Sequence, residues 1–528
     1  MKPLLEGTVV GSNLVIGVDV GTSATKAILF DEFGKIHAEG RSVYPSLHPH
    51  PGWVEQEAEW WWEAFKNAVG KLLKQASAPL DIKGIAVTHQ RISYVPVDRK
   101  MRALRPAILW NDIRCVSQNK KALDLMDGEL IYRRTGYMPG LWTVYKVMWL
   151  KENEPEVYRD TFKILLVQDY LVYKLTGELL TTASSAVMTG CLDVKKKNQW
   201  ADDVLEAFGV SPSLFLDRIL NGGEIAGVIH RKAADETGLR MGLPVFAAAG
   251  DQPCGLLGTG AIQPHTTSIN GGTSCTIETC CEDLHLEPPA NYFVEISPTG
   301  TYLKENSIPS GGSSLMNWLR ELFSEVKGDS GEETDWRSFY QMAKAAPTGN
   351  SGLMLIPFFS GANAPYWDLN ARGIILGLLL DYGKPHFVRA VMEGLAYETR
   401  RILDVMKSGM NTQISEVRMY GGSAKSDIWN QIFADVLGLE VRTLDTPETT
   451  ALGAAICAAR GLGIYSNFDS AVANMVRVEK EYFPDQAHHR IYNQLFNEVY
   501  SKFYDQVRGL VDNLSGITER LSGRSLEA

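Results

Sequence analysis

Two short glycine-threonine-serine sequences, nearly identical, lie in opposite halves of this chain and constrain its fold more than any other feature. They are Gly21-Thr22-Ser23-Ala24-Thr25 and Gly272-Thr273-Ser274-Cys275-Thr276. Each follows a β-type run, 14–20 in one case and 266–270 in the other, so each predicts a tight hairpin whose backbone N–H groups and hydroxyls can face phosphate oxygens. Gly-Thr-Ser is common in turns, so either loop alone would be weak evidence for a phosphate site. Because the sequence occurs twice, we predict a nucleotide site shared by two related halves.

The length of the chain predicts two large domains, because 528 residues exceed what one hydrophobic core usually supports. The formal net charge of −10 argues against nucleic acid as a partner. The seven cysteines are scattered and suit neither a disulfide framework nor a metal site, so we expect reduced thiols in the cytoplasm. Residues 1–12 lack a secretion signal and the chain lacks an apolar run of about 18 residues, so we expect neither secretion nor a membrane partner.

Strand-type and helix-type segments alternate along the chain, which predicts an α/β architecture. The expected strands are 14–20, 25–30, a third from Ile36, 82–88, 244–250, 266–270 and 416–420. The expected helices are one that carries Trp61, Phe65, Ala68 and Leu72, an amphipathic one over 426–437, and one that starts at Thr446-Pro447-Glu448. The segment 258–264, rich in turn-forming residues, is the expected boundary between the halves.

Two aspartates lie at or just after the ends of predicted strands, at positions suited to phosphoryl transfer, which needs charge neutralisation and an acceptor held in line. Asp19 directly precedes the first loop, where a carboxylate can hold Mg²⁺ and Lys26 can offset phosphate charge. Asp251 follows the strand 244–250 and is our candidate general base for a sugar hydroxyl, with Gln252 orienting the acceptor. The structural alternatives are a turn cap at Asp19 and a helix N-cap at Asp251.

Apolar residues recur every four positions near the C-terminus, at Ile491, Leu495, Val499 and Phe503, with tyrosines beside them. This spacing predicts a helix that docks its apolar side on the body of the protein. A subunit contact is the alternative, which leaves a homodimer open.

Several sequence blocks, taken in order, resemble the FGGY family of carbohydrate kinases over about residues 14–510. The blocks are Asp19-x-Gly-Thr-Ser, Trp110-Asn-Asp-x-Arg114, Lys146-x-x-Trp149-Leu, Gly250-Asp-Gln252, Gly271-Gly-Thr-Ser274, Gly421-Gly422 and Glu448-x-x-Ala-Leu-Gly-Ala-Ala455. Gly373-Ile-Ile-Leu-Gly377-Leu, followed by His386-Phe and Ala390-Val-Met-Glu393, is similar to the downstream signature of the family.

The resemblance implies two actin-like (ribonuclease H-like) α/β ATPase domains with an interdomain cleft. Residues 1–13 would be an N-terminal extension, 14–258 a domain with the sugar site and the catalytic base, and 265–528 a nucleotide-binding domain with C-terminal helices. The implied reaction is the phosphorylation of a hydroxyl on a small sugar or polyol by ATP, with Mg²⁺.

The resemblance also assigns residues to the two substrates. For the nucleotide it implies Thr22, Ser23 and Thr273 at the phosphates, Gly422 and Ser426 beside the adenine, and Asn317 nearby; the loops themselves add Gly21, Gly272, Ser274 and Gly421. For the acceptor it implies Gln90, Arg91, Ile92, Asn111 and Asp112, with Asp251 as the base.

The acceptor-contacting residues bear on which sugar is bound. Glycerol kinases carry a glutamate where this chain has Ile92, which cannot accept a hydrogen bond, whereas the stretch from Leu109 to Cys115 is similar to xylulose kinases. We therefore expect a ketopentose such as xylulose; glycerol, erythritol, ribulose and autoinducer-2 are alternatives. Arg91 either favours an acceptor with extra oxygens or a carboxylate, or pairs with Asp112. A non-catalytic actin-like ATP-binding regulator is the alternative from another class.

Overall fold

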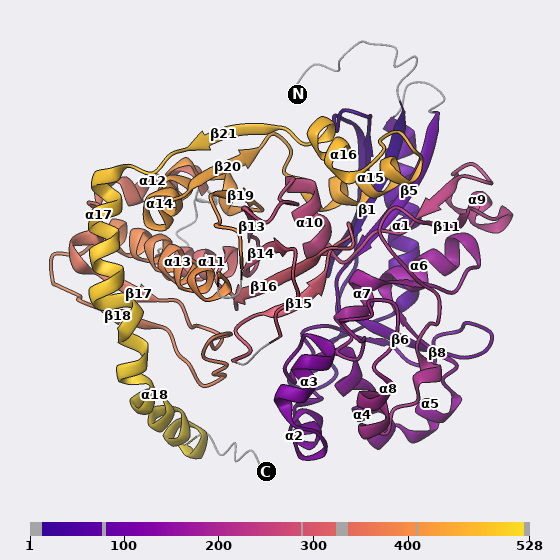
Figure 1. Cartoon of the computed structure of the whole chain (residues 1–528), viewed down its shortest axis with the longest axis horizontal. Coiled ribbons are helices and arrows are strands. Elements are labelled where there is room, and N and C mark those ends of the chain that lie inside the picture. The colour runs from indigo at the N-terminus through magenta and orange to yellow at the C-terminus, as the bar shows by residue number, and fades with distance from the viewer. Residues whose placement is uncertain (1–12, 76–80, 287–288, 324–335, 408–409, 522–528) are drawn as a thin grey trace, which may run out of the picture. The chain divides into compact units, whose positions relative to one another are not determined.

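The structure is a computed structural model that describes residues 13–75, 81–286, 289–323, 336–407 and 410–521. The chain forms two compact units, coloured along the chain in Figure 1. Unit 1 comprises Met1–Ile262, Val294–Tyr302 and Glu448–Arg477, and unit 2 comprises Gln263–Phe293, Leu303–Pro447 and Val478–Ala528. Each unit therefore draws on segments that are far apart in the sequence.

Within the described residues, the main sheet of unit 1 has six strands in the order β11-β12-β5-β1-β2-β3. Their bounds are β1 Leu14–Val20, β2 Ala24–Phe30, β3 Ile36–Val43, β5 Ile82–His89, β11 Ile225–Val228 and β12 Pro244–Phe246. Strand β1 is antiparallel to β2 and parallel to β5, and β12 is parallel to β5. The predicted strands at the start of the chain and at 82–88 are thus confirmed, whereas the strand predicted at 244–250 ends at Phe246. All of them belong to one sheet.

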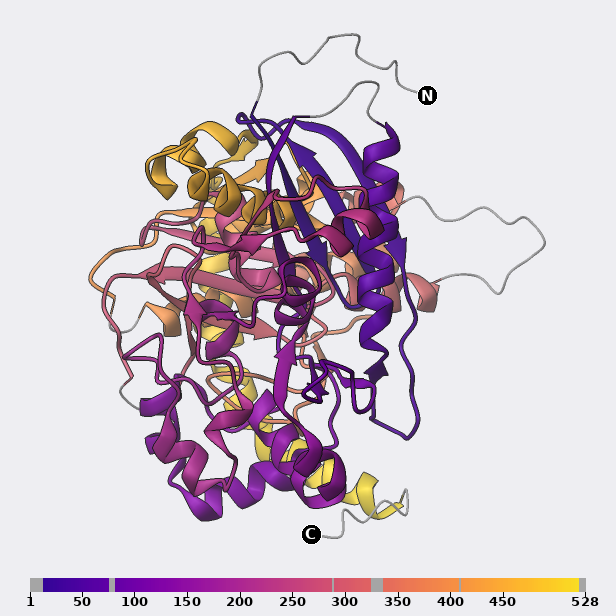
Figure 2. The ribbon, with the colours of Figure 1, turned by 90° about the vertical axis from the view of Figure 1, so that its right-hand side faces the viewer.

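Helices cover both faces of this sheet, which explains why β1 is apolar on both sides. Helix α1 (Ala58–Gln75) packs on β2 and β3, as Figure 2 shows, and a Cβ added to Gly40 of β3 would lie 1.9 Å from its Ala68 carbonyl oxygen. Helix α15 (Thr449–Gly461) packs on β1 and β5, and a Cβ on Gly17 would lie 1.9 Å from its Ala451 oxygen. The two glycines let the backbones of helix and strand approach closely.

Two helix boundaries differ from the sequence-based expectation. Glu448 is the N-cap of α15, so the helix starts at Thr449 rather than at Thr446-Pro447-Glu448. Helix α10 (Asp251–Thr259) continues through Gly258, the first residue of the predicted boundary segment 258–264. A Cβ on Gly258 would lie 1.8 Å from the Thr449 oxygen, so this glycine serves helix packing rather than a linker.

The rest of unit 1 is a smaller four-stranded sheet in the order β4-β7-β6-β8, a two-stranded pair β9-β10, and short helices. The strands are β4 Glu55–Gln56, β6 Tyr94–Val97, β7 Ala107–Ile108, β8 Lys163–Leu166, β9 Thr181–Thr182 and β10 Ile219–Leu220. The helices are α2 Val116–Leu125, α3 Gly128–Thr135, α4 Thr143–Asn153, α5 Pro155–Asp160, α6 Val167–Thr176, α7 Ala183–Val187, α8 Asp202–Ala207, α9 Arg231–Thr237 and α16 Phe468–Met475.

In unit 2, strands β16, β14, β13, β19, β20 and β21 follow one another across a second sheet. The strands of the unit are β13 Thr266–Gly271, β14 Cys275–Cys281, β16 Tyr302–Ile308, β17 Met354–Ile356, β18 Ile374–Leu376, β19 Glu416–Tyr420, β20 Glu440–Leu444 and β21 Val478–Tyr482. Strand β15 (Phe293–Ile296) lies almost entirely in the segment Val294–Tyr302 of unit 1. The helices are α11 Ser313–Phe323, α12 Trp336–Gln341, α13 Lys384–Met406, α14 Asp427–Leu437, α17 Gln486–Leu495 and α18 Ser501–Leu521.

The C-terminal helices dock through a different face from the one that the apolar spacing predicted. Tyr492, Phe496, Tyr500 and Tyr504 are the buried residues, whereas Ile491 is 43% exposed. The Tyr492 hydroxyl donates to Glu393 Oε1 of α13 at 2.7 Å, because an amphipathic tyrosine can fill an apolar groove and satisfy a buried carboxylate at once. The predicted docking is confirmed, and the predicted face is wrong.

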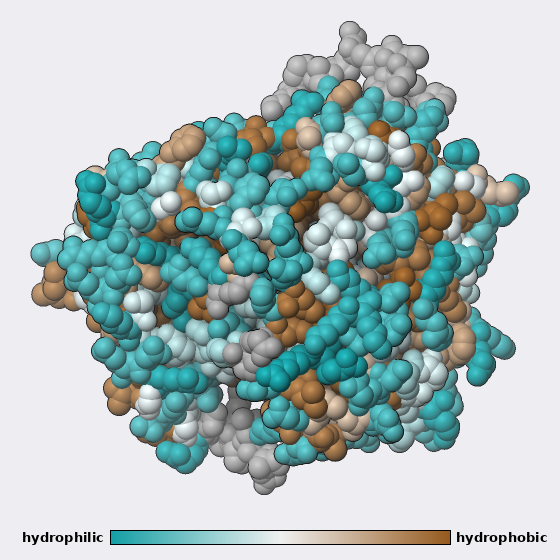
Figure 3. Space-filling view, in the orientation of Figure 1, coloured by the Kyte–Doolittle hydropathy of each residue, from teal (hydrophilic) through white to brown (hydrophobic). Residues whose placement is uncertain are grey.

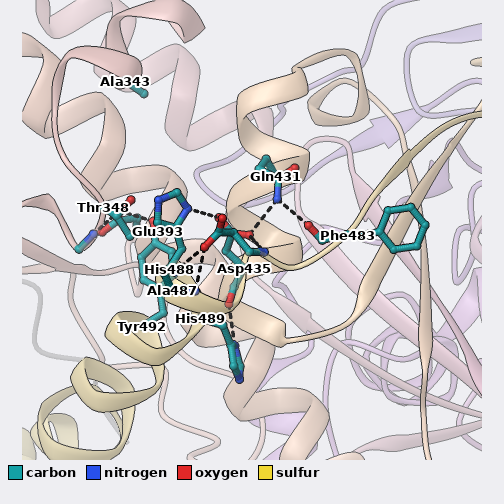
Figure 4. Close-up of polar contacts among 12 residues, drawn as sticks. Ala343, Thr348, Glu393, Gln431, Asp435, Phe483, Ala487, His488, His489 and Tyr492 are labelled. Carbon is teal, nitrogen blue, oxygen red and sulfur yellow. Dashed lines mark hydrogen bonds and ion pairs between the residues drawn. The ribbon is translucent and has the colours of Figure 1, made fainter.

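A second set of contacts fixes the start of α17 on α14. Asp435 of α14 is buried, and its Oδ2 lies 3.0 Å from His488 Nδ1, as Figure 4 shows. Asp435 Oδ1 accepts from Gln431 Nε2 at 2.8 Å, and its carbonyl oxygen lies 2.8 Å from His489 Nδ1. The contacts with His488 and His489 join two helices that lie about 50 residues apart in the sequence.

Hydrophilic residues cover most of the face seen in Figure 3, with small hydrophobic patches between them. None of the helices in the described part of the chain is long and apolar enough to cross a lipid bilayer.

Candidate functional site

The carboxyl ends of three neighbouring strands of unit 1 gather the candidate catalytic residues. Asp19 of β1 lies opposite Thr88 of β5, and His89, at the end of β5, forms a bridge with Gly250 beyond β12. Because these strands are parallel, the residues that follow them emerge at one edge of the sheet. Asp19, Gln90-Arg91 and Asp251 therefore lie at the same edge, although they come from segments as much as about 230 residues apart.

Asp251 is the first residue of α10, and Gly250 is its N-cap, so the N-cap alternative for Asp251 is wrong. Its Oδ1 accepts from the Gln252 backbone N–H at 2.9 Å and lies 3.2 Å from Arg91 Nε. The Asp251 side chain is 31% exposed, which leaves the carboxylate reachable by a ligand.

Arg91 pairs with Asp251 and Glu295, so the predicted alternative of an Arg91–Asp112 pair is wrong. Arg91 Nη1 donates to Glu295 Oε1 at 2.6 Å. Ile92, the next residue, has φ +69°, a left-handed conformation that a β-branched side chain rarely adopts. Such strain persists only where the surroundings impose it, and it is found mainly at functional sites.

Asp19 has the environment of a cation ligand. Burial, the charge of Asp251 and that of Glu448 raise the pKa of Asp19 to about 7, while Lys26 acts in the opposite direction. Among the described residues, none hydrogen-bonds to the enclosed Asp19 Oδ1. Lys26 of β2 lies opposite Asp19, and its Nζ lies 2.8 Å from Glu448 Oε2. A buried carboxylate oxygen that lacks a protein donor fits a divalent cation held directly or through water.

The first loop is a tight turn that contacts the acceptor-side residues. Gly21 N donates to Ala24 O at 3.0 Å, which closes the turn between β1 and β2. Trp110 Nε1 donates to Thr22 Oγ1 at 3.0 Å, and Gln56 Nε2 donates to Thr22 O at 2.7 Å. Ser23 is exposed. Ser23 is therefore exposed on this loop, while hydrogen bonds from Trp110 and Gln56 hold Thr22 in place.

The segment that follows β7 presents Asn111 and buries Asp112. The Asp112 carboxylate is 0% exposed; it accepts from Val54 N at 2.6 Å and pairs with Arg114 at 2.7 Å. Lys146 Nζ donates to the carbonyl oxygens of Leu109 and Trp110 at 2.6 and 3.0 Å. Burial lowers the pKa of Lys146 to about 8. Asn111 is exposed, so these buried contacts hold the loop in place and leave the amide accessible.

Gln90 is also buried, and its Nε2 donates to Gln56 Oε1 at 3.1 Å. Gln56 thus connects Gln90 to the first loop, a link that sequence reasoning missed because neither the spacing nor the composition around residue 56 marks it.

In unit 2 the second loop lies beside the glycines that follow β19. Strands β13 and β19 are parallel, with Asn270 opposite Tyr420. Gly421 has φ +81°, and a Cβ there would lie 2.6 Å from Asn270 Oδ1. The second loop, Gly272–Ser274, and the glycines Gly421–Gly422 are therefore neighbours, as a phosphate-binding turn requires.

The start of α11 also contacts the second loop. Ser313 N donates to Gly272 O at 2.6 Å, and Gly312 N donates to Thr273 O at 3.2 Å. A Cβ on Gly312 would lie 2.0 Å from Gly272 O, so only glycine fits. Asn317 lies one turn further along α11 and is half-buried. Sequence reasoning selected Asn317 but missed Gly312, although Gly311-Gly312 stands out as a glycine pair before a helix.

Ser426 is the N-cap of α14, where its hydroxyl accepts from Trp429 N at 3.4 Å. It is 4% exposed, while Gly422 lies four residues before it. The predicted helix at 426–437 is confirmed as Asp427–Leu437, with Ser426 as its N-cap rather than its first residue.

Comparison with known proteins identifies the family. The N-terminal domain of the FGGY family of carbohydrate kinases matches residues 14–258, and the C-terminal domain of that family matches 267–462. A xylulose kinase from Staphylococcus epidermidis is 30% identical over 96% of this chain and 99% of the relative. A glycerol kinase from Thermococcus kodakarensis is 31% identical over 89% of this chain and 92% of the relative.

A solved structure extends the similarity to three dimensions. The crystal structure of ligand-bound xylulose kinase from Lactobacillus acidophilus has a TM-score of 0.87 and 25% identity, and covers 95% of this chain and 100% of that one. The predicted two-domain α/β architecture of the actin-like ATPase type is thereby confirmed. The chain belongs to the FGGY family of carbohydrate kinases.

Proposed function

We propose that this kinase transfers the γ-phosphoryl group of ATP to a hydroxyl of a xylulose-type ketopentose, with Mg²⁺, in the cytoplasm. The observation that carries the proposal is the gathering of Asp19, Arg91 and Asp251 at the carboxyl ends of β1, β5 and β12. A metal-binding acid and a partly exposed acid at one edge of a sheet meet the needs of in-line phosphoryl transfer.

Asp251 acts as the general base in this proposal. As the acceptor oxygen forms its bond to the γ-phosphorus, its proton passes to the Asp251 carboxylate, and the bond from that phosphorus to the ADP oxygen breaks. Arg91 holds Asp251 Oδ1 from the side, and Gln252 follows it on α10. Mg²⁺ held by Asp19 would supply charge neutralisation at the transferred group.

The residues that we assign to the nucleotide offer backbone N–H groups, hydroxyls and one side-chain amide. In unit 1 these are Gly21, Thr22 and Ser23, and Lys26 supplies a positive charge. In unit 2 they are Gly272, Thr273, Ser274, Gly421, Gly422, Asn317 and Ser426. The support is the close approach of Gly312 and Gly421 to the second loop, which leaves no space for a side chain there.

The acceptor is a neutral sugar. Arg91, the cation of the acceptor set, is paired with both Asp251 and Glu295, so its charge is already balanced. Ile92 is 7% exposed, and its side chain cannot accept a hydrogen bond from a glycerol hydroxyl. The similarity to xylulose kinases supports a ketopentose. We propose that Asn111 contacts the sugar and that Asp112 supports the loop.

The test measures ADP production with xylulose, ribulose, erythritol, glycerol and an aldonate, using wild type, Asp251→Asn and Asp124→Asn. Asp124 is an exposed aspartate on α2 and serves as the matched control. We expect xylulose to stimulate turnover most, Asp251→Asn to lose about 100-fold or more in kcat, and Asp124→Asn to match wild type. Turnover that no acceptor stimulates would favour the non-catalytic regulator, and normal transfer by Asp251→Asn would refute the base. Light scattering tests whether the protein is a homodimer, the alternative that the C-terminal apolar spacing leaves open.

A further inference from the structure

We propose that Glu295 is a positioning residue that holds Asp251 in its working orientation by acting through Arg91. The inference rests on the proposed role of Asp251 as general base. Glu295 lies in β15 and belongs to the segment Val294–Tyr302, which comes from the later part of the chain but packs within unit 1.

One guanidinium group connects the two carboxylates. Arg91 Nε lies 3.2 Å from Asp251 Oδ1, and Nη1 lies 2.6 Å from Glu295 Oε1. The Glu295 side chain is 0% exposed, and the Tyr137 hydroxyl donates to the same Oε1 at 2.8 Å. A buried charge pair with an added hydrogen bond fixes the geometry of its partners strongly, because breaking it leaves an uncompensated charge.

Two further features seat Arg91 in this position. A Cβ on Gly250 would lie 2.4 Å from Arg91 Cγ, so the stem of the arginine passes over a residue that must be glycine. The backbone after it is held as well, since Ser93 N donates to Arg91 O at 2.7 Å and Thr143 Oγ1 donates to Ile92 O at 2.8 Å. These bonds maintain the left-handed conformation of Ile92.

The segment that carries Glu295 is itself anchored on unit 1 at both ends. Val294 N donates to Gly136 O at 3.0 Å, next to Tyr137. Lys197 Nζ donates to Gly300 O at 2.7 Å. Glu295 is therefore held rigidly, so it can orient Arg91, and Arg91 in turn orients Asp251.

The charge of Glu295 determines how the Arg91 guanidinium group binds the Asp251 carboxylate. With Glu295 ionised, the guanidinium group divides its N–H groups between two carboxylates. With a neutral residue at 295, Arg91 loses this carboxylate partner, and the guanidinium group can turn to bind the Asp251 carboxylate with two N–H groups. That arrangement competes with the acceptor hydroxyl for the carboxylate and lowers kcat.

The experiment measures kcat and both KM values for Glu295→Gln, Arg91→Ala, the double variant and Asp251→Asn, with Glu129→Gln as the control at an exposed glutamate of α3. We expect Glu295→Gln to lower kcat about 10- to 100-fold, with the KM for ATP unchanged within about twofold. In the Arg91→Ala background the same change should alter kcat by less than about twofold, because the residue acts through Arg91.

Two results would overturn the inference. One is a Glu295→Gln enzyme with wild-type kcat while Asp251→Asn is inactive. The other is an equal loss of kcat on Glu295→Gln with and without Arg91, which indicates a general structural effect. Normal transfer by Asp251→Asn is a separate result that refutes the proposed base itself.

Discussion

His89 is a fully buried histidine beside the candidate catalytic residues. Its Nδ1 lies 2.8 Å from Gln90 O and its Nε2 lies 2.9 Å from Ser185 Oγ. Burial, with a smaller effect of the Arg91 charge, lowers the pKa of His89 to about 4. The imidazole is therefore neutral at pH 7, and it holds the end of β5 at the position where Gln90 and Arg91 begin.

This histidine makes the folded protein sensitive to acid. Between about pH 6.5 and pH 4 the unfolded chain binds a proton at this residue that the folded chain does not, so stability is lost as the pH falls through that window. We expect His89→Gln to be less stable than wild type at pH 8 but to lose less of its thermal midpoint between pH 8 and pH 5. Melting curves across this range provide the measurement, and parallel pH dependence of the two proteins would contradict the prediction.

Helices α10 and α15 cross with almost no side-chain volume between them. A Cβ on Gly453 of α15 would lie 1.9 Å from the Cys254 oxygen of α10, and one on Gly258 would lie 1.8 Å from the Thr449 oxygen. Helix α10 begins at Asp251 and α15 is capped by Glu448, so this contact also sets the distance between two charged residues of the site. Close packing of these helices therefore bears on the catalytic geometry.

We expect Gly453→Ala to destabilise the protein by about 1–3 kcal/mol, because the added methyl group meets backbone atoms that cannot move aside cheaply. The matched control is Gly509→Ala in α18, where no atom lies within 4 Å of the new Cβ. There the better helix propensity of alanine should stabilise the helix by about 1 kcal/mol. Urea unfolding of both variants tests the contrast, and a neutral Gly453→Ala would show that the helices can separate without cost.

Unit 1 includes two segments that come later in the chain than its contiguous part, Val294–Tyr302 and Glu448–Arg477. Helix α15 supplies an almost entirely buried run from Ala451 to Ala459 against β1, β5 and α10. The contiguous part of the unit, ending at Ile262, lacks this helix and the segment that carries Glu295. A fragment without them exposes one face of its main sheet.

A chain that ends at Ile262 should therefore lack a cooperative thermal transition and should bind a hydrophobic dye, whereas the full chain should melt sharply. Circular dichroism and dye fluorescence on the two proteins make the comparison. A sharp melt of the fragment would mean that α15 adds little to the core of unit 1.

The amino-acid sequence alone was enough to identify the strand-loop-strand units at both glycine-threonine-serine sequences, the alternation of strands and helices, and the aspartates that end strands. These features depend on hydrogen bonding and periodicity over a few residues, which composition and spacing record directly. The family blocks added the enzyme class, and the comparisons confirmed it.

Tertiary structure alone decided which partners those residues have. The Lys26–Glu448 pair joins residues 422 positions apart, and the Arg91–Glu295 pair joins residues 204 apart. Likewise, the C-terminal helices dock through their tyrosines, because the hydroxyls of Tyr492 and Tyr500 donate hydrogen bonds to buried carboxylates of α13. Such contacts leave no local pattern in the sequence, since a buried charge is compensated by whatever residue the fold brings beside it.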